Sequence, residues 1–171
     1  MNAMSSLFIR NGRIKTMQGP EFIGSILIEG TKIKAMGENL EAPQGVEVIE
    51  AEGKLVLPGF IDAHCHVGLG EEIYQHEGDD LNEMTDPVTP ELRAIDGINP
   101  EDEAFRDARL GGVTAVFSTP GSGNVIGGTG VVLKTAGKVV DKMILRDPAG
   151  LKVAFGENPK MVYGGEQKKM P

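Results

Sequence analysis

The stretch from Pro58 to Val67, which reads PGFIDAHCHV, limits the fold more than any other part of the chain. Three polar residues recur in it at a spacing of two: Asp62, His64 and His66. Side chains alternate between the two faces of an extended strand, so these three project to the same side. Two imidazoles on one strand face can reach a single metal ion. The stretch therefore predicts a divalent metal, zinc or a similar borderline ion, bound at a β-strand.

A strand with incidental histidines is the plainer alternative. Two of the chain's three histidines lie here, next to a carboxylate and on an otherwise apolar strand. If buried, their ring nitrogens would all need partners, and this favours the metal site. Asp62 would then orient a ligand or touch the metal itself. The same alternation points Cys65 away from the histidines, as a small core residue.

Two ligands do not make a tight site, and further ligands are expected at the carboxyl ends of parallel strands. Glu157 follows a predicted strand at 150–155 and is a candidate third ligand, with a solvated loop acid as the equal alternative. Lys152, within that strand, would contribute only after conversion to a carbamate. His76 lies in an acidic loop, where a solvated side chain is the simpler interpretation.

The chain before Pro58 shows short alternating strands broken by glycine and asparagine. Asn11-Gly12 is typical of a hairpin turn, and Gly30-Thr31 predicts a second turn. Residues 1–57 are therefore expected to form the first part of a small antiparallel β-sandwich without a catalytic constellation.

Residues 58–171 are expected to form a second, α/β domain. Its first strand, at 60–67, has the composition of a strand buried on both faces. An aperiodic acidic stretch follows at 68–99, and then a helix that Asn99 would cap and Gly111-Gly112 would end. A β-branched strand at 113–118 completes a βαβ unit, which implies a parallel sheet. The glycine-rich loop at 119–130 matches no phosphate-binding pattern and is expected to permit close backbone packing.

Composition excludes several classes of function. The net charge of −8 disfavours binding to nucleic acid. No apolar run approaches the roughly 18–20 residues that a membrane-spanning helix needs. A single cysteine rules out an intramolecular disulfide and indicates a reducing, cytoplasmic setting.

Together these segments resemble the metal-dependent amidohydrolase superfamily. The match rests on LPGFIDAHCH at 57–66 and on IRNGRI, ILIEGTKIKAMG and EAEGKLVLPG before it. Downstream, PVTPELRAIDGINP, GGVTAVFSTPGSGNVIGGTG and AFGENPK are similar to imidazolonepropionase-like amidohydrolases in particular.

The resemblance implies a β-sandwich beside a (β/α)8 barrel, in which a metal-activated water hydrolyses a C–N bond of a small, possibly cyclic, amide. His64 and His66 match the metal ligands of the first barrel strand, and Glu157 is the candidate for a strand-end glutamate ligand. No histidine follows His76, so the family's later histidines and its aspartate base have no counterpart, and no catalytic residue is assigned.

The 114 residues after Leu57 fall short of the about 200 that a barrel requires. The chain is thus expected to be an N-terminal part with roughly the first three barrel strands, inactive alone. Its open apolar edges favour a homo-oligomer. The alternative function is a non-enzymatic assembly protein on the same scaffold.

Overall fold

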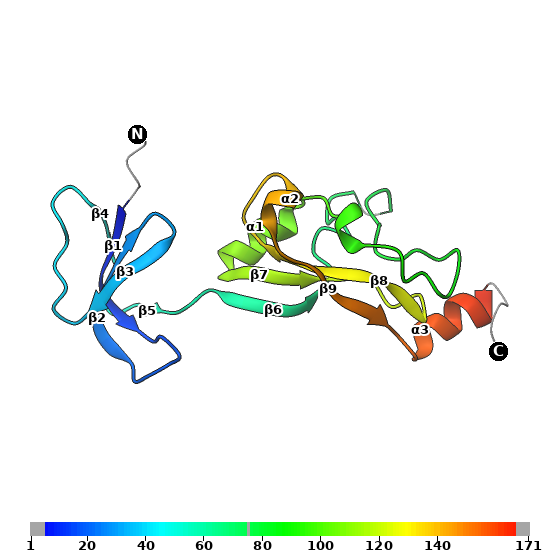
Figure 1. Cartoon of the computed structure of the whole chain (residues 1–171), viewed down its shortest axis with the longest axis horizontal. Coiled ribbons are helices and arrows are strands. Elements are labelled where there is room, and N and C mark those ends of the chain that lie inside the picture. Colours follow the sequence, from blue (N-terminus) through cyan, green and yellow to red (C-terminus); the bar gives the residue numbers. More distant parts are fainter. Residues whose placement is uncertain (1–5, 75, 167–171) are drawn as a thin grey trace. The chain divides into compact units, whose positions relative to one another are not determined.

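The computed structural model describes residues 6–74 and 76–166, and the chain divides into two compact units after Pro58. This division lies one residue from the boundary expected at 57/58. The fold is mixed α/β, as expected, and each unit holds one sheet (Figure 1).

The first unit is a five-stranded sheet centred on β1 (Ser6–Ile14). β1 pairs antiparallel with β2 (Phe22–Glu29), which forms a hairpin with β3 (Lys32–Gly37). On its other side β1 pairs in parallel with β4 (Glu47–Glu50) and with β5 (Leu55–Val56). Phe8, Ile14, Ile26 and Leu27 are its buried apolar residues, together with Ala51.

Two expectations for this unit are wrong. The sheet is mixed rather than antiparallel, because β4 and β5 return beside β1 in its own direction. Asn11-Gly12 is not a hairpin turn but a bulge inside β1, where the register shifts between Ile9 and Gly12 and Asn11 has a φ of 56°. The left-handed preference of Asn serves a bulge as well as a turn. The turn at Gly30-Thr31 is confirmed between β2 and β3.

The second unit is a four-stranded sheet in the order β6-β7-β8-β9. β6 (Phe60–Cys65) and β7 (Val113–Ser118) are parallel, as the βαβ pattern predicted. β8 (Ile126–Lys134) and β9 (Ile144–Val153) continue the sheet in antiparallel fashion, so the parallel sheet ends after one strand pair. Among the described residues, a barrel is therefore not visible.

Short helices cover one side of this sheet (Figure 1). Phe105 of α1 (Glu103–Leu110) and Met143 of α2 (Val140–Met143) join one buried cluster with Val116, Val131 and Leu133 of the sheet. The chain closes with α3 (Glu157–Pro159) and the π-helical segment η2 (Lys160–Glu166). No helix in the described ranges is both long and apolar enough to cross a membrane.

Helix α1 begins later than predicted. Its cap is Asp102, whose carboxylate accepts a hydrogen bond from the backbone N–H of Ala104 at 3.3 Å. Asn99 instead shapes the turn before the helix, since its Oδ1 accepts from the N–H of Glu101. Gly111 and Gly112 end the helix as expected.

The acidic stretch at 68–99 is ordered by the sheet rather than by its own periodicity. Residues 88–93 run beside β8: Thr89 N–H donates to Ile126 O and Thr129 N–H donates to Leu92 O, both at 2.8 Å. The 3₁₀ helix η1 (Ala94–Asp96) follows, with Ala94 and Ile95 buried. Residues 88–93 thus pair with the first part of β8, which β7 does not reach.

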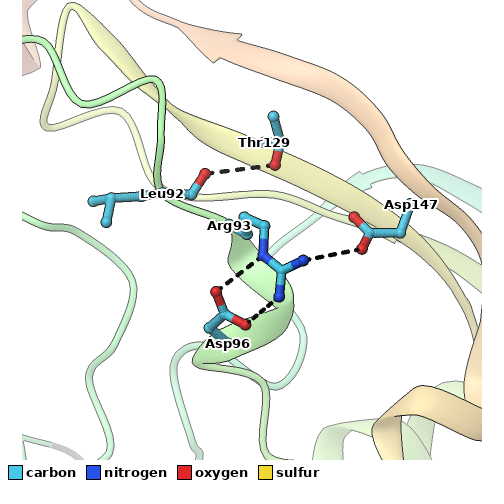
Figure 2. A network of polar contacts seen from close by, with 5 residues as sticks. All are labelled: Leu92, Arg93, Asp96, Thr129 and Asp147. Atoms are coloured by element: carbon cyan, nitrogen blue, oxygen red, sulfur yellow. Dashed lines mark hydrogen bonds and ion pairs between the residues drawn. The ribbon is translucent and has the colours of Figure 1, made fainter.

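Arg93 reinforces this contact (Figure 2). Its guanidinium donates to both carboxylate oxygens of Asp96, at 3.1 and 2.7 Å, and lies 4.0 Å from Asp147 of β9. The hydrogen bonds from Arg93 lower the pKa of Asp96. The group therefore ties η1 to β9 while remaining largely in solvent.

The prediction that the strand at 60–67 is buried on both faces is wrong. β6 is an edge strand, and the residues from Phe60 to His64 are exposed, Ile61 to 71%. β9 forms the other edge and exposes Leu145, Leu151 and Val153.

Candidate metal site

The two histidines lie together at the carboxyl end of β6. His64 is in the strand and exposed, whereas His66 follows the strand and is half-buried. Their ring centroids are 5.5 Å apart, with the planes inclined at 76°. The spacing of two thus brings both imidazoles into one small region, as the sequence predicted.

A hydrogen bond fixes which nitrogen His66 presents. Its Nδ1 lies 2.7 Å from the backbone oxygen of Thr119, the residue directly after β7. A carbonyl oxygen only accepts, so Nδ1 carries the proton and donates, and in the neutral ring this leaves the lone pair on Nε2. Metal-binding histidines are commonly held in this way, with one nitrogen donating to a carbonyl and the other facing the ion.

Further hydrogen bonds lock the ends of β6 and β7 together. The N–H of Thr119 donates to Cys65 O at 3.1 Å, and the hydroxyl of Ser118 donates to Val67 O at 2.8 Å. Ser118 and Thr119 are almost fully buried. Because partners on both sides of His66 are fixed, the position of its ring is set by the parallel strand pair rather than by a free loop.

Asp62 and Cys65 differ in their surroundings. The carboxylate of Asp62 accepts the backbone N–H of His64 at 3.0 Å, beside the histidine pair. Cys65 packs against the buried cluster, and its thiol lies 3.7 Å from Phe117 O. Burial raises the pKa of the Cys65 thiol, so it stays protonated at neutral pH.

The two remaining candidate ligands come from β9 and from the helix that follows it. Glu157 opens α3, after β9 has already ended at Val153; its side chain is 79% exposed and lies 3.4 Å from Lys160 Nζ. Lys152 is half-buried in β9, and burial lowers its pKa. Within residues 6–74 and 76–166, no three side chains of His, Cys, Asp or Glu are grouped so as to hold a metal. The described site is a histidine pair with a neighbouring carboxylate.

Comparison with known proteins places the chain in a family. No protein-family model matches it. It is 33% identical over 157 residues to the amidohydrolase tasK of Hapsidospora irregularis, and 41% identical over 63 residues to a dihydroorotase of Geobacter metallireducens. The crystal structure of an amidohydrolase from Thermotoga maritima superposes on 96% of the chain with a TM-score of 0.89, at 46% sequence identity. The chain belongs to the amidohydrolase superfamily.

The matches differ in how much of each protein they cover. The match to tasK covers 84% of the present chain, and the match to the dihydroorotase covers 36% of it. The chain in turn spans 43% of the Thermotoga maritima structure, 16% of tasK and 15% of the dihydroorotase. The fold of both units, including the antiparallel β8 and β9, is therefore shared with a solved amidohydrolase, although the chain spans less than half the length of these relatives.

Asp102 is a structurally important residue that the sequence alone did not indicate. It is 5% exposed, and besides capping α1 it accepts the N–H groups of Gly68 at 3.2 Å and Glu72 at 3.4 Å. It thereby fastens the segment just after His66 to the start of α1. The signal was present in the sequence as an Asp directly before the helix, but Asn99-Pro100 gave a competing start signal.

The chain also has a cavity beside His66, of about 260 Å³, that the sequence did not reveal. Its walls come from His66, from the acidic loop at Asn82, from the glycine-rich loop at 121–123, and from Asn158 next to Glu157. Segments far apart in the sequence thus meet on the side where the histidine pair lies.

Proposed function

We propose that the protein containing this chain is a metal-dependent hydrolase of C–N bonds in small molecules, with His64 and His66 as two of its metal ligands. Hydrolysis of C–N bonds in a general sense accords with the relatives, which are named amidohydrolase and dihydroorotase. The hydrogen bond from His66 Nδ1 to Thr119 O is the observation that supports the metal, since it leaves Nε2 as an oriented donor next to the ring of His64.

The donor chemistry fits zinc or a similar borderline divalent ion. Imidazole nitrogens suit such ions, and the Asp62 carboxylate adds negative charge on the same strand. When bound, such an ion lowers the pKa of a water molecule and polarises a carbonyl. The chain's own residues would bind the ion and orient its ligands, because the hydrogen-bonded ends of β6 and β7 hold the imidazoles in place. The cavity beside His66 would accommodate a small substrate.

Metal content of the full-length protein tests the proposal. The double variant His64→Ala/His66→Ala should lose its metal and its hydrolase activity together. His76→Ala is the matched control, because it removes the third histidine, an exposed one in the acidic loop. Elemental analysis that finds stoichiometric metal in the double variant would overturn the assignment.

Glu157 remains a proposed further ligand, and Glu157→Gln tests it separately. If Glu157 is a ligand, Glu157→Gln should lower the metal affinity by at least about tenfold, because the loss of a group that only orients a ligand already costs about 10- to 100-fold. Metal affinity equal to that of the unchanged protein would leave Glu157 as the ion-pair partner of Lys160.

Exposed apolar side chains favour a second candidate, a protein that acts by assembly. Ile61 on β6 and Leu145, Leu151 and Val153 on β9 lie on edge strands, which readily pair with other chains. A homo-oligomer that forms equally well with and without the two histidines, and hydrolyses no amide, would support this function. Light scattering on the protein with and without the two histidines, together with an assay of amide hydrolysis, distinguishes an assembly protein from a hydrolase.

A further inference from the structure

A tight turn begins at His66, directly after β6. The N–H of Leu69 donates to His66 O at 3.0 Å and closes a β-turn over residues 66–69. Gly68, the third residue of this turn, has a φ of 86°, and a type II turn requires a positive φ at that position. A Cβ atom at Gly68 would lie 2.8 Å from the side chain of Ile98. The turn therefore depends on glycine, and its first residue is a candidate metal ligand.

The central peptide group of the turn is hydrogen-bonded at both of its ends. The hydroxyl of Ser118 donates to Val67 O at 2.8 Å, and the N–H of Gly68 donates to Asp102 Oδ2 at 3.2 Å. Type I and type II turns differ mainly by a flip of this peptide group. Because both of its ends are held, a flip would break a hydrogen bond at each end.

Ser118 and Asp102 differ in what else they do. Asp102 also caps α1, so its carboxylate has a structural task at the helix as well as at the turn. Ser118 is the last residue of β7 and is fully buried, and among the hydrogen bonds of the described residues its hydroxyl takes part in this one alone. Removal of the Ser118 hydroxyl would therefore release the turn after His66 and leave Val67 O without that partner.

The residue after Ser118 holds the imidazole itself. Thr119 O lies 2.7 Å from His66 Nδ1, and the N–H of Thr119 donates to Cys65 O at 3.1 Å. Two adjacent residues at the end of β7 thus hold the backbone on both sides of His66 and one nitrogen of its ring. If Val67 shifts, the backbone of His66 shifts relative to Thr119 O, and the hydrogen bond to the ring is strained.

We propose that Ser118 is a positioning residue for the metal ligand His66. Its hydroxyl holds the Val67–Gly68 peptide group in the type II orientation, and this keeps the imidazole of His66 beside that of His64. The inference rests on the proposed metal-dependent function and adds to it a residue that contacts neither metal nor substrate. Loss of a group that orients a metal ligand typically lowers metal affinity about 10- to 100-fold.

Two variants of the full-length protein separate positioning from stability. Ser118→Ala removes the hydroxyl and puts no larger group in its place. Thr135→Val is the matched control, because the buried hydroxyl of Thr135 donates to Val113 O at 2.9 Å, at the opposite end of β7. Each variant loses one hydrogen bond from a buried hydroxyl to a backbone carbonyl oxygen, so their urea midpoints should fall by similar amounts.

Co²⁺ is the probe, added to the metal-free full-length protein and followed by its visible absorption, which reports on ligand geometry. Ser118→Ala should bind Co²⁺ about 10- to 100-fold more weakly than the unchanged protein, with an altered absorption spectrum. Thr135→Val should bind it as the unchanged protein does. If circular dichroism shows that Ser118→Ala is unfolded in buffer, all three proteins are titrated in sucrose, which favours the folded state.

The same Co²⁺ affinity in Ser118→Ala and Thr135→Val, whether unchanged or lowered alike, would overturn the inference. Failure of the proposed function is a different result: Co²⁺ that binds as tightly to His64→Ala/His66→Ala as to the unchanged protein.

Discussion

Replacing Gly128 with alanine should detach the segment at 88–93 from the sheet. An alanine Cβ at this position would lie 2.4 Å from Leu92 O, whereas ordinary contacts begin near 3.4 Å, so Leu92 must retreat by about 1 Å. Leu92 O accepts the N–H of Thr129 at 2.8 Å, and this retreat breaks that bond. The neighbouring bond from Thr89 to Ile126 is expected to follow, because the same short segment carries both.

The free energy of unfolding should fall by about 2 kcal/mol, since each lost backbone hydrogen bond contributes roughly 0.5–1.5 kcal/mol. Urea unfolding followed by circular dichroism measures the change, and amide exchange at Thr129 locates it. Gly127→Ala is the matched control on the neighbouring residue of β8. Its Cβ would make an ordinary contact of 3.5 Å with Lys152, and it gains the same unfolded-state restriction.

If Gly128→Ala and Gly127→Ala unfold within about 0.5 kcal/mol of each other, the reasoning is refuted. The glycine would then be tolerant, and the edge of β8 would not hold the acidic loop in the way that the hydrogen bonds indicate.

Three further outcomes are expected. Asp102→Ala should lower the free energy of unfolding of the second unit by about 2–4 kcal/mol, because the helix loses its cap and two further N–H groups lose their acceptor. The control Asp107→Ala removes an exposed carboxylate and should lower it by less than about 0.5 kcal/mol. Equal urea midpoints for the two variants would contradict this. Phe105→Ala should lower the free energy of unfolding by about 3–5 kcal/mol, because it empties a buried position. Leu110→Ala should change it little, because the Leu110 side chain is 72% exposed. Because its pKa is raised, the Cys65 thiol of the folded chain should react slowly with a disulfide reagent at pH 8 and faster as the pH rises further. The unfolded chain should react quickly at pH 8. Equal reaction rates for the folded and unfolded chains would show that burial does not protect the thiol.

Short-range chemistry explains what could be predicted. The turn at Gly30-Thr31, the helix stop at Gly111-Gly112 and the paired histidines each depend on a few neighbouring residues, and the structure has all three. The close packing expected of the glycine-rich loop is confirmed as well, at Gly121 and Gly123.

The incorrect predictions arose where one local signal serves two structures. Asn11-Gly12 suits a bulge as well as a turn, and pairing with β2, β4 and β5 on both sides of β1 decided for the bulge. Asn99 and Asp102 are both good caps. Asp102 is the cap in the structure because its carboxylate also accepts hydrogen bonds from the N–H groups of Gly68 and Glu72. Only the folded chain brings these groups near Asp102.

The amino-acid sequence by itself determined that two imidazoles project from one strand, because the alternation of side chains along a strand needs no other part of the chain. It also carried the motifs that mark an amidohydrolase. Tertiary structure alone decided that Thr119, 53 residues from His66, fixes the tautomer of that histidine, and that Asn82 reaches the same cavity. Contacts of this kind depend on strand pairing and loop docking, whose energy comes from segments far apart in the chain, so no local pattern specifies them.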